Sequence, residues 1–280
     1  MFTFGLSVGL RSILRGNLKI GLRRVVNPVS YWRYPVFNLV KEYVKEQEEL
    51  NVLDIGSPKL LALYLAVKKH FNVTSIDIQD PEIFSVWLKY YNDYLILKNT
   101  NRKGSIFRPE YQDARNLSYP DNCFDLVYSI SVIEHIPYDG DSIAMKEIAR
   151  VLRPGGTAII EVPFSYKKYD TFVNNDIYER KCSGKDIFYQ RHYDPRSVYD
   201  RIIFPSELSV EKMCIFRERM PFEKYIEMFP IYCKIPLLFL SSIISKLNHQ
   251  RLNDNLLKLE NKIIEEKRKD IIIYLKKNVS

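Results

Sequence analysis

The chain has 280 residues, a net charge of +8 and a mean hydropathy of −0.23. This length provides one sizeable hydrophobic core and suits one domain with insertions. Four cysteines lie far apart without a C-x-x-C pair, which argues against a zinc site and a disulfide framework and favours a reducing, cytoplasmic setting.

Residues 1–30 carry basic residues and no acid. A basic stripe and an apolar stripe each repeat every four residues, as expected on one helix, although Gly16 and Gly21 count against an unbroken one. The basic members are Arg11, Arg15, Lys19 and Arg23, and the apolar members are Leu10, Leu14, Leu18 and Leu22. The basic residues interrupt the apolar run, so a signal peptide is not expected. Such a helix can lie in an anionic membrane interface or pack on the domain with its arginines in water.

The next distinctive stretch, residues 51–60, is a short apolar run that changes into a helical pattern. It predicts a buried strand, a tight turn at Gly56, and a helix that begins with Ser57 as N-cap and Pro58 in its first turn. Backbone N–H groups at such a helix start favour an anionic group. Asp54, at the end of the strand, can accept hydrogen bonds from an amine. Together these groups suit an amino-acid-like zwitterion.

A second predicted strand, residues 73–78, also carries an acid, Asp77, near its end. An acid at this place can bind both hydroxyls of a ribose. Further motifs follow in order: Asp113-Ala114, the run 117–127, the run 132–135 and Leu152-Arg153-Pro154-Gly155-Gly156.

With these motifs, the sequence from about Asn51 to Phe164 resembles the class I S-adenosylmethionine (SAM) dependent methyltransferases. The resemblance implies a Rossmann-like α/β fold, with a seven-stranded sheet, helices on both faces and SAM as cofactor. One departure is that only Gly56 remains of the family's glycine-rich turn, with Pro58 and Leu60 where further glycines are common. We expect an N-terminal extension over residues 1–34 and the methyltransferase domain over residues 35–280.

The resemblance also implies which residues bind the cofactor. Asp54, Gly56 and Ser57 would lie at its methionine end, and Asp77 with Ile78 at its ribose. Asp113 would accept from the adenine amino group while the Ala114 N–H reaches a ring nitrogen; a turn cap is the alternative for Asp113. Ser129 would lie beside the sulfonium, and Arg33, just before a helix expected over 35–49, is the candidate for the methionine carboxylate.

Histidine is the natural base for a hydroxyl acceptor, and the chain has four histidines. His135 and His192 are the base candidates, and each could instead be a hydrogen-bonded structural histidine. We interpret His70 and His249 as structural. No His, Asp or Glu cluster has the spacing of metal ligands, so no metal is expected.

The remaining segments predict insertions around the sheet. Residues 166–193 form a long polar and aromatic connection, which is typical of a lid. Residues 209–217 predict a sixth strand, and residues 270–276 a seventh, antiparallel one. Between them lies an insertion over about 220–267, whose apolar part, 228–247, contains a lysine and two prolines and is a poor transmembrane span.

The sequence therefore predicts a SAM-dependent methyltransferase that acts on a small-molecule, lipid or glycan acceptor, by preference on oxygen. Ser129-Ile130-Ser131-Val132 lacks the Asn or Asp, prolines and aromatic residue typical of enzymes that methylate nucleobase or glutamine amines, and no nucleic-acid partner is expected. One alternative is a nicotinamide-dependent oxidoreductase, but this sequence lacks the G-x-G-x-x-G turn that such an enzyme requires. The other alternative is a non-catalytic SAM-binding module. The basic N-terminus and the apolar insertion raise peripheral contact with the inner membrane face as a further hypothesis.

Overall fold

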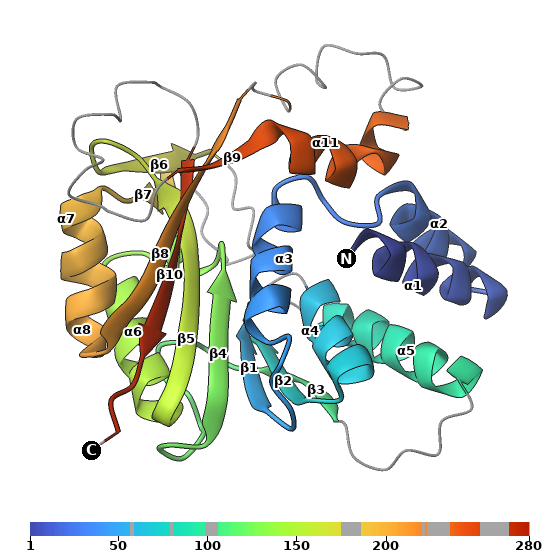
Figure 1. Ribbon diagram of the computed structural model, residues 1–280, viewed down its shortest axis with the longest axis horizontal. Helices are drawn as coiled ribbons and strands as arrows, with labels where there is room; N and C mark the ends of the chain where they lie inside the picture. Colours follow the sequence, from blue (N-terminus) through green and yellow to red (C-terminus); the bar gives the residue numbers. More distant parts are fainter. Residues whose placement is uncertain are drawn as a thin grey trace.

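The computed structural model describes residues 1–56, 59–78, 81–98, 106–174, 186–219, 222, 236–252 and 269–279. An eight-stranded sheet runs through the molecule in the order β3-β2-β1-β4-β5-β10-β8-β9 (Figure 1). Its strands are β1 (Asn51–Ile55), β2 (Asn72–Asp77), β3 (Phe107–Tyr111), β4 (Phe124–Ile130), β5 (Leu152–Phe164), β8 (Ser209–Glu218), β9 (His249–Leu252) and β10 (Lys269–Lys276). The first seven positions of this order confirm the expected Rossmann-like sheet, and the short edge strand β9 extends it.

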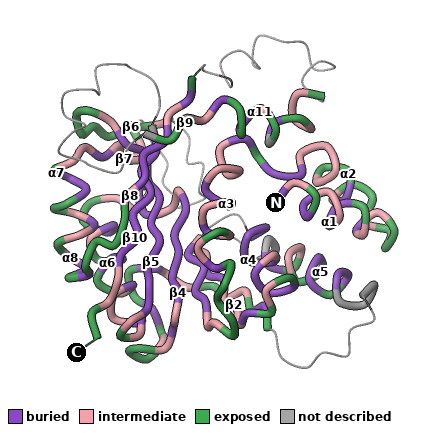
Figure 2. The backbone as a smooth tube through the Cα atoms, viewed as in Figure 1, coloured by how far each residue is buried: buried purple, intermediate pink, exposed green. Residues whose placement is uncertain are grey.

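The sheet is buried on both faces, because its central strands alternate side chains between two apolar clusters (Figure 2). One face is covered by α1 (Phe2–Leu14), α3 (Arg33–Tyr43), α4 (Leu60–Tyr64) with the π-helical turn Leu65–Lys69, and α5 (Pro81–Lys98). The other is covered by α6 (Gly140–Val151), α7 (Pro195–Val198), the π-helical turn Tyr199–Ile203 and α8 (Phe204–Ser206). The molecule therefore has three layers, with helices on both faces of the sheet.

β10 confirms the predicted antiparallel seventh strand. Ile271–Ile273 pair with β5 on one side and with β8 on the other, both antiparallel. β10 therefore starts at the edge where β1, β2, β4 and β5 end, which we call the carboxyl edge. Asp270 is brought to this edge although it lies far from those strands in sequence.

The N-terminal helix predicted over 1–30 is a helical hairpin in the structure. The chain breaks at Gly16, whose φ of +80° is a left-handed conformation, and resumes in α2 (Leu18–Val26). The two helices pack closely at Gly9 and Gly21, where an added Cβ would lie within 3 Å of backbone atoms of the other helix. Phe4 and Val8 of α1 join the main core, so the hairpin packs on the domain.

Three other expectations need correction. α3 ends at Tyr43, short of the predicted Glu49, and turns lead on to β1. Leu152-Arg153-Pro154-Gly155-Gly156 belongs to the start of β5, where a register shift against β4 absorbs the turn residues. The connection 166–193 is partly paired: β6 (Tyr169–Val173) and β7 (Ile187–His192) form a two-stranded antiparallel ribbon, as their aromatic and β-branched residues favour.

The apolar insertion is described only in part, since 220–221, 223–235 and 253–268 lie outside the described residues. Its visible helix, α11 (Ser241–Asn248), packs near α3, where the Ser241 hydroxyl donates to the Val29 carbonyl over 3.1 Å. Within the described ranges, none of the helices combines the length and apolarity that crossing a bilayer requires.

Candidate functional site

The two acids predicted to bind the cofactor lie at the carboxyl edge on neighbouring strands. β1 pairs in parallel with β2, which places Asp54 one step before the end of β1 and Asp77 at the end of β2. Between them the chain turns at Gly56, whose φ of +56° is left-handed. An added Cβ there would lie 2.7 Å from a methyl carbon of Val132, in the turn after β4. The turns after β1 and β4 therefore meet closely, and glycine is required at the contact.

A buried lysine that sequence reasoning missed joins the two acids. The Lys59 ammonium donates to the Ile76 carbonyl over 3.0 Å, and lies 3.5 Å from Asp77 Oδ2 and 3.8 Å from Asp54 Oδ2. Both Lys59 and Asp54 are buried. The signal was present in the sequence, as a single lysine at the start of an otherwise apolar helix and at the position of the family's glycine-rich turn.

Asp54 is held in one orientation by its neighbours. The Ser75 hydroxyl of β2 donates a short hydrogen bond to Asp54 Oδ2. Tyr128 of β4 faces the same carboxylate, and its burial, together with the Asp54 charge, raises the pKa of the Tyr128 hydroxyl well above its usual value. Asp54 therefore accepts hydrogen bonds at a fixed place.

The other residues assigned to the nucleoside are spread along the same edge. Ile78 follows Asp77 and is 46% exposed. Asp113 forms a bidentate pair with the Arg115 guanidinium, which lowers the Asp113 pKa. Asp113 also accepts a hydrogen bond from the Arg115 backbone N–H, which is the contact expected of a turn cap. Ala114 is buried beside it. Ser57 and Pro58 lie outside the described residues.

At the ends of β4 and β5, Arg33 lies beside a buried acid. Its Nη1 is 3.7 Å from Glu161 Oε2 and 3.5 Å from the Ile130 carbonyl oxygen. The Ser131 hydroxyl donates to the same Glu161 oxygen over 2.7 Å. Ser129 is fully buried between Ile55 and Ile160 within the sheet. Arg33 is thus at the carboxyl edge as predicted, whereas Ser129 lies inside the sheet below it.

His135 follows β4 in a 3₁₀ turn (Ile133–His135) and contacts the ribbon. Its Nδ1 lies 2.7 Å from the Tyr189 carbonyl oxygen. A carbonyl only accepts, so Nδ1 carries the proton and Nε2 carries the lone pair. Nε2 in turn lies 3.6 Å from Glu134 Oε1. The pKa of the fully buried Glu134 is well above its usual value, first because of burial and second because of the Glu161 charge.

His192 lies elsewhere, on the ribbon. Its ring stacks on Tyr169 with 4.2 Å between centroids, and its Nε2 is 2.8 Å from the Gln190 amide nitrogen. That amide donates, so the Nε2 lone pair is engaged. Of the two predicted bases, His135 is the one that lies beside the buried acids at the carboxyl edge.

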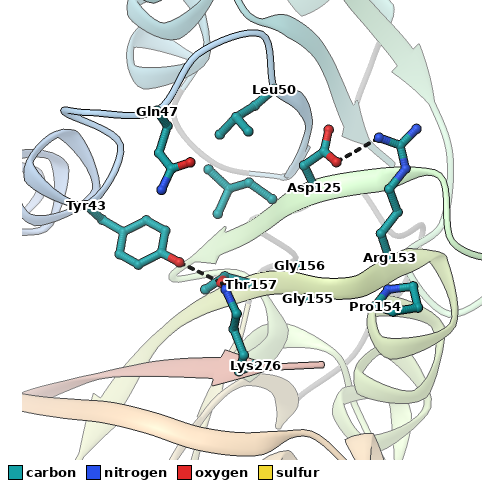
Figure 3. A pocket seen from close by; sticks show the side chains of 11 residues that line it. Tyr43, Gln47, Leu50, Asp125, Arg153, Pro154, Gly155, Gly156, Thr157 and Lys276 are labelled. Carbon is teal, nitrogen blue, oxygen red and sulfur yellow. Dashed lines mark hydrogen bonds and ion pairs between the residues drawn. The ribbon is translucent and has the colours of Figure 1, made fainter. Parts of the chain in front are cut away.

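A pocket of about 230 Å³ opens at the opposite edge, where β4 and β5 begin (Figure 3). It is lined by Tyr43, Thr157 and Lys276 together with the Asp125–Arg153 pair, whose atoms are 2.7 Å apart. The Tyr43 and Thr157 hydroxyls lie 2.6 Å apart across it. The polar groups of this pocket pair with one another. Because the pocket lies where β4 and β5 begin, it is separate from the carboxyl-edge site. No group of three metal-ligating side chains occurs in the part of the chain that the structure describes.

Comparison with known proteins identifies the domain. Residues 53–160 match the family described as a methyltransferase domain. A SAM-dependent methyltransferase from Methanosarcina mazei has a similar fold, with a TM-score of 0.52 and 15% identity over 86% of this chain and 98% of that chain. Residues 53–160 of the chain thus carry a methyltransferase domain. SAM is the cofactor of such domains.

Two curated relatives match shorter segments of this chain. A ubiquinone/menaquinone biosynthesis C-methyltransferase, UbiE, from Neisseria gonorrhoeae is 35% identical over 27% of this chain and 31% of its own. The 27-O-demethylrifamycin SV methyltransferase of Amycolatopsis mediterranei is 47% identical over 17% of this chain and 16% of its own. The matched segments therefore span less than a third of either relative. The names of the two relatives give different acceptor atoms, carbon for the first and oxygen for the second.

Proposed function

We propose that the protein transfers the methyl group of SAM to a hydroxyl group of a small-molecule, lipid or glycan acceptor. The observation that carries the proposal is the placement of Asp54 and Asp77 on adjacent strand ends around the Gly56 turn, inside a segment that matches the methyltransferase family. The rifamycin relative, which is named for an O-methylation, supports oxygen as the acceptor atom.

The residues present fit this cofactor. Asp77 is oriented by Lys59 and would accept from the ribose hydroxyls, while Asp54 and the Gly56 turn would hold the amino-acid end. Arg33 is placed to pair with the methionine carboxylate, provided that it turns from Glu161. Bound SAM supplies an electrophilic methyl group. The protein then contributes chiefly by alignment, which lowers a barrier by about 7–11 kcal/mol in favourable cases.

His135 is the proposed base. The Tyr189 carbonyl fixes its tautomer, so Nε2 is able to take the proton of an acceptor hydroxyl. His135→Gln should lower kcat by about two to four powers of ten while SAM affinity stays unchanged. His192→Gln is the matched comparison and should have the smaller effect, because its Nε2 is already engaged with Gln190.

Calorimetry tests the cofactor assignment. We expect SAM and its demethylated product S-adenosylhomocysteine to bind, and NAD not to bind. Asp77→Asn should weaken both nucleosides about tenfold or more, since a charge-assisted pair is lost, whereas Glu46→Gln, at a side chain that is 85% exposed, should change nothing. NAD binding would favour the oxidoreductase alternative, and SAM binding without turnover on any acceptor would favour the non-catalytic module.

A specific observation supports membrane contact as a second element of the function. Leu14 and Leu18 are 77% and 58% exposed, and Leu10 and Leu22 are also exposed on the α1–α2 hairpin. Arg15, Lys19 and Arg23 are exposed beside them, and the first acid of the chain is Glu42. Apolar groups flanked by cations suit an anionic lipid surface.

Sedimentation with anionic liposomes tests this contact. The parent protein should sediment at low salt and be released as salt rises. Leu14→Asp with Leu18→Asp should stay in the supernatant, whereas Val210→Asp, at an exposed apolar residue of β8, should behave as the parent. A parent that stays in the supernatant at low salt would end the membrane proposal.

A further inference from the structure

A buried acid at the carboxyl edge, Glu134, receives no hydrogen bond from another side chain among the described residues. Glu134 is fully buried, and among the described residues neither of its side-chain oxygens has a hydrogen-bond partner. The His135 Nε2 atom is 3.6 Å from one of them, which is beyond hydrogen-bond distance. Buried polar groups are almost always paired, so an unpaired acid in a native site calls for an explanation.

Glu134 belongs to a group of acids contributed by separate elements. Glu161 of β5 and Asp270 of β10 are both buried and both raise the pKa of Glu134 through their charges, while Arg33 of α3 acts in the opposite direction. Among the described residues, the Glu161 carboxylate accepts from the Ser131 hydroxyl and has a longer contact with Arg33. Glu134 and Glu161 thus lie in one buried group that includes Arg33 and His135.

The place of this group relates it to the transferred methyl. Glu134 lies two residues after Val132, which contacts the Gly56 turn of the cofactor site. Glu161 lies near the end of β5 and Asp270 starts β10, beyond β4 when seen from Asp54 and Asp77. The acids therefore occupy the acceptor side of the carboxyl edge rather than the nucleoside side.

We propose that Glu134 and Glu161 bind a protonated amino group of the acceptor, so that the acceptor is an amino alcohol. An ammonium group carries three donors and no acceptor, and its binding would displace the proton that burial holds on Glu134, so that a charge-assisted contact forms. The 3.6 Å between His135 Nε2 and Glu134 Oε1 matches an amine and a hydroxyl on neighbouring carbon atoms. The hydroxyl would then lose its proton to His135 as its oxygen bonds to the methyl group and the bond between that methyl group and the SAM sulfur breaks, which leaves S-adenosylhomocysteine. The amine is the group by which the acceptor is recognised. This inference rests on the proposed function and narrows its substrate class.

Binding of matched probes to the protein loaded with S-adenosylhomocysteine tests the inference. The probes are 2-amino-1-hexanol and 1,2-hexanediol, which differ only in the charged group. We expect the parent to bind the amino alcohol about tenfold more tightly than the diol, as for one charge-assisted contact. Glu134→Gln and Glu161→Gln should each bring the two probes to within about twofold. Glu211→Gln, an exposed acid of β8, should keep the preference of the parent.

The outcomes separate the two levels of the proposal. If the parent does not bind S-adenosylhomocysteine, the proposed function fails and the inference fails with it. If that ligand binds but the parent shows no preference for the amino alcohol, only the inference is overturned. A preference that survives in both glutamine variants also overturns it. Thermal unfolding and S-adenosylhomocysteine affinity show whether each variant is folded. If neither glutamine variant folds, Ser131→Ala is the substitute, because it removes a donor from Glu161 and should strengthen the preference for the amino alcohol. An unchanged preference in Ser131→Ala would refute the proposed ammonium site.

Discussion

Replacing Lys59 with methionine should destabilise the protein strongly, because it leaves two acids without their shared cation. The ammonium lies 3.5 Å from Asp77 and 3.8 Å from Asp54, and all three side chains are largely buried. Removing one partner of a buried ion pair costs about 3–5 kcal/mol. Asp77 is 16% exposed and Asp54 retains Ser75. We therefore expect a loss of about 3 kcal/mol in the free energy of unfolding, near the low end of that range.

Urea unfolding followed by circular dichroism measures this loss. Lys45→Met is the matched control, because the Lys45 side chain is 78% exposed and pairs with the similarly exposed Glu46. Its effect on the free energy of unfolding should stay within about 0.5 kcal/mol. Combining Lys59→Met with Asp54→Asn should cost less than the sum of the two single changes, because the pair is coupled. A loss below about 1 kcal/mol, or strict additivity, would refute the assigned role of this lysine.

Three further outcomes follow from single residues. Gly56→Ala should lower stability by about 2 kcal/mol and weaken SAM binding, because alanine meets both the left-handed φ and the Val132 methyl; unchanged calorimetry would contradict this. Asp141→Ala should lower stability by about 3 kcal/mol or more, since this fully buried acid accepts from Arg191, Tyr193 and Arg201; thermal unfolding checks it. The raised pKa of Glu134 means that the native state keeps a proton that the unfolded chain releases, so stability falls as pH rises from the ordinary glutamate pKa towards the raised one. Glu134→Gln should remove this part of the slope in urea titrations at pH 5 to 8, and an unaltered slope would exclude a raised pKa.

Much of the fold could be predicted from local sequence. The apolar runs over 51–55 and 124–130, the acid at the end of each of the first two strands, and the turn residues between them each act through their neighbours in the chain. Asp194 acts just as locally, because it caps α7 through Ser197, which is three residues away. Hydrophobic patterns likewise predicted seven strands of the large sheet along the chain, whereas β6, β7 and the edge strand β9 were not predicted.

The composition of the candidate site depended instead on contacts between distant segments. Glu134 is close enough to be affected by the charges of Glu161 and Asp270 because β5 and β10 bring these acids to the same edge, and no local sequence pattern indicates that proximity. The tautomer of His135 is set by a carbonyl 54 residues away. Lys59 pairs with acids on two strands, and the break at Gly16 folds α2 back on α1. The sequence by itself therefore determined the strands, their terminal acids and the family. Only the tertiary structure decided which charges are desolvated together, because burial and pairing depend on the packing of the whole sheet.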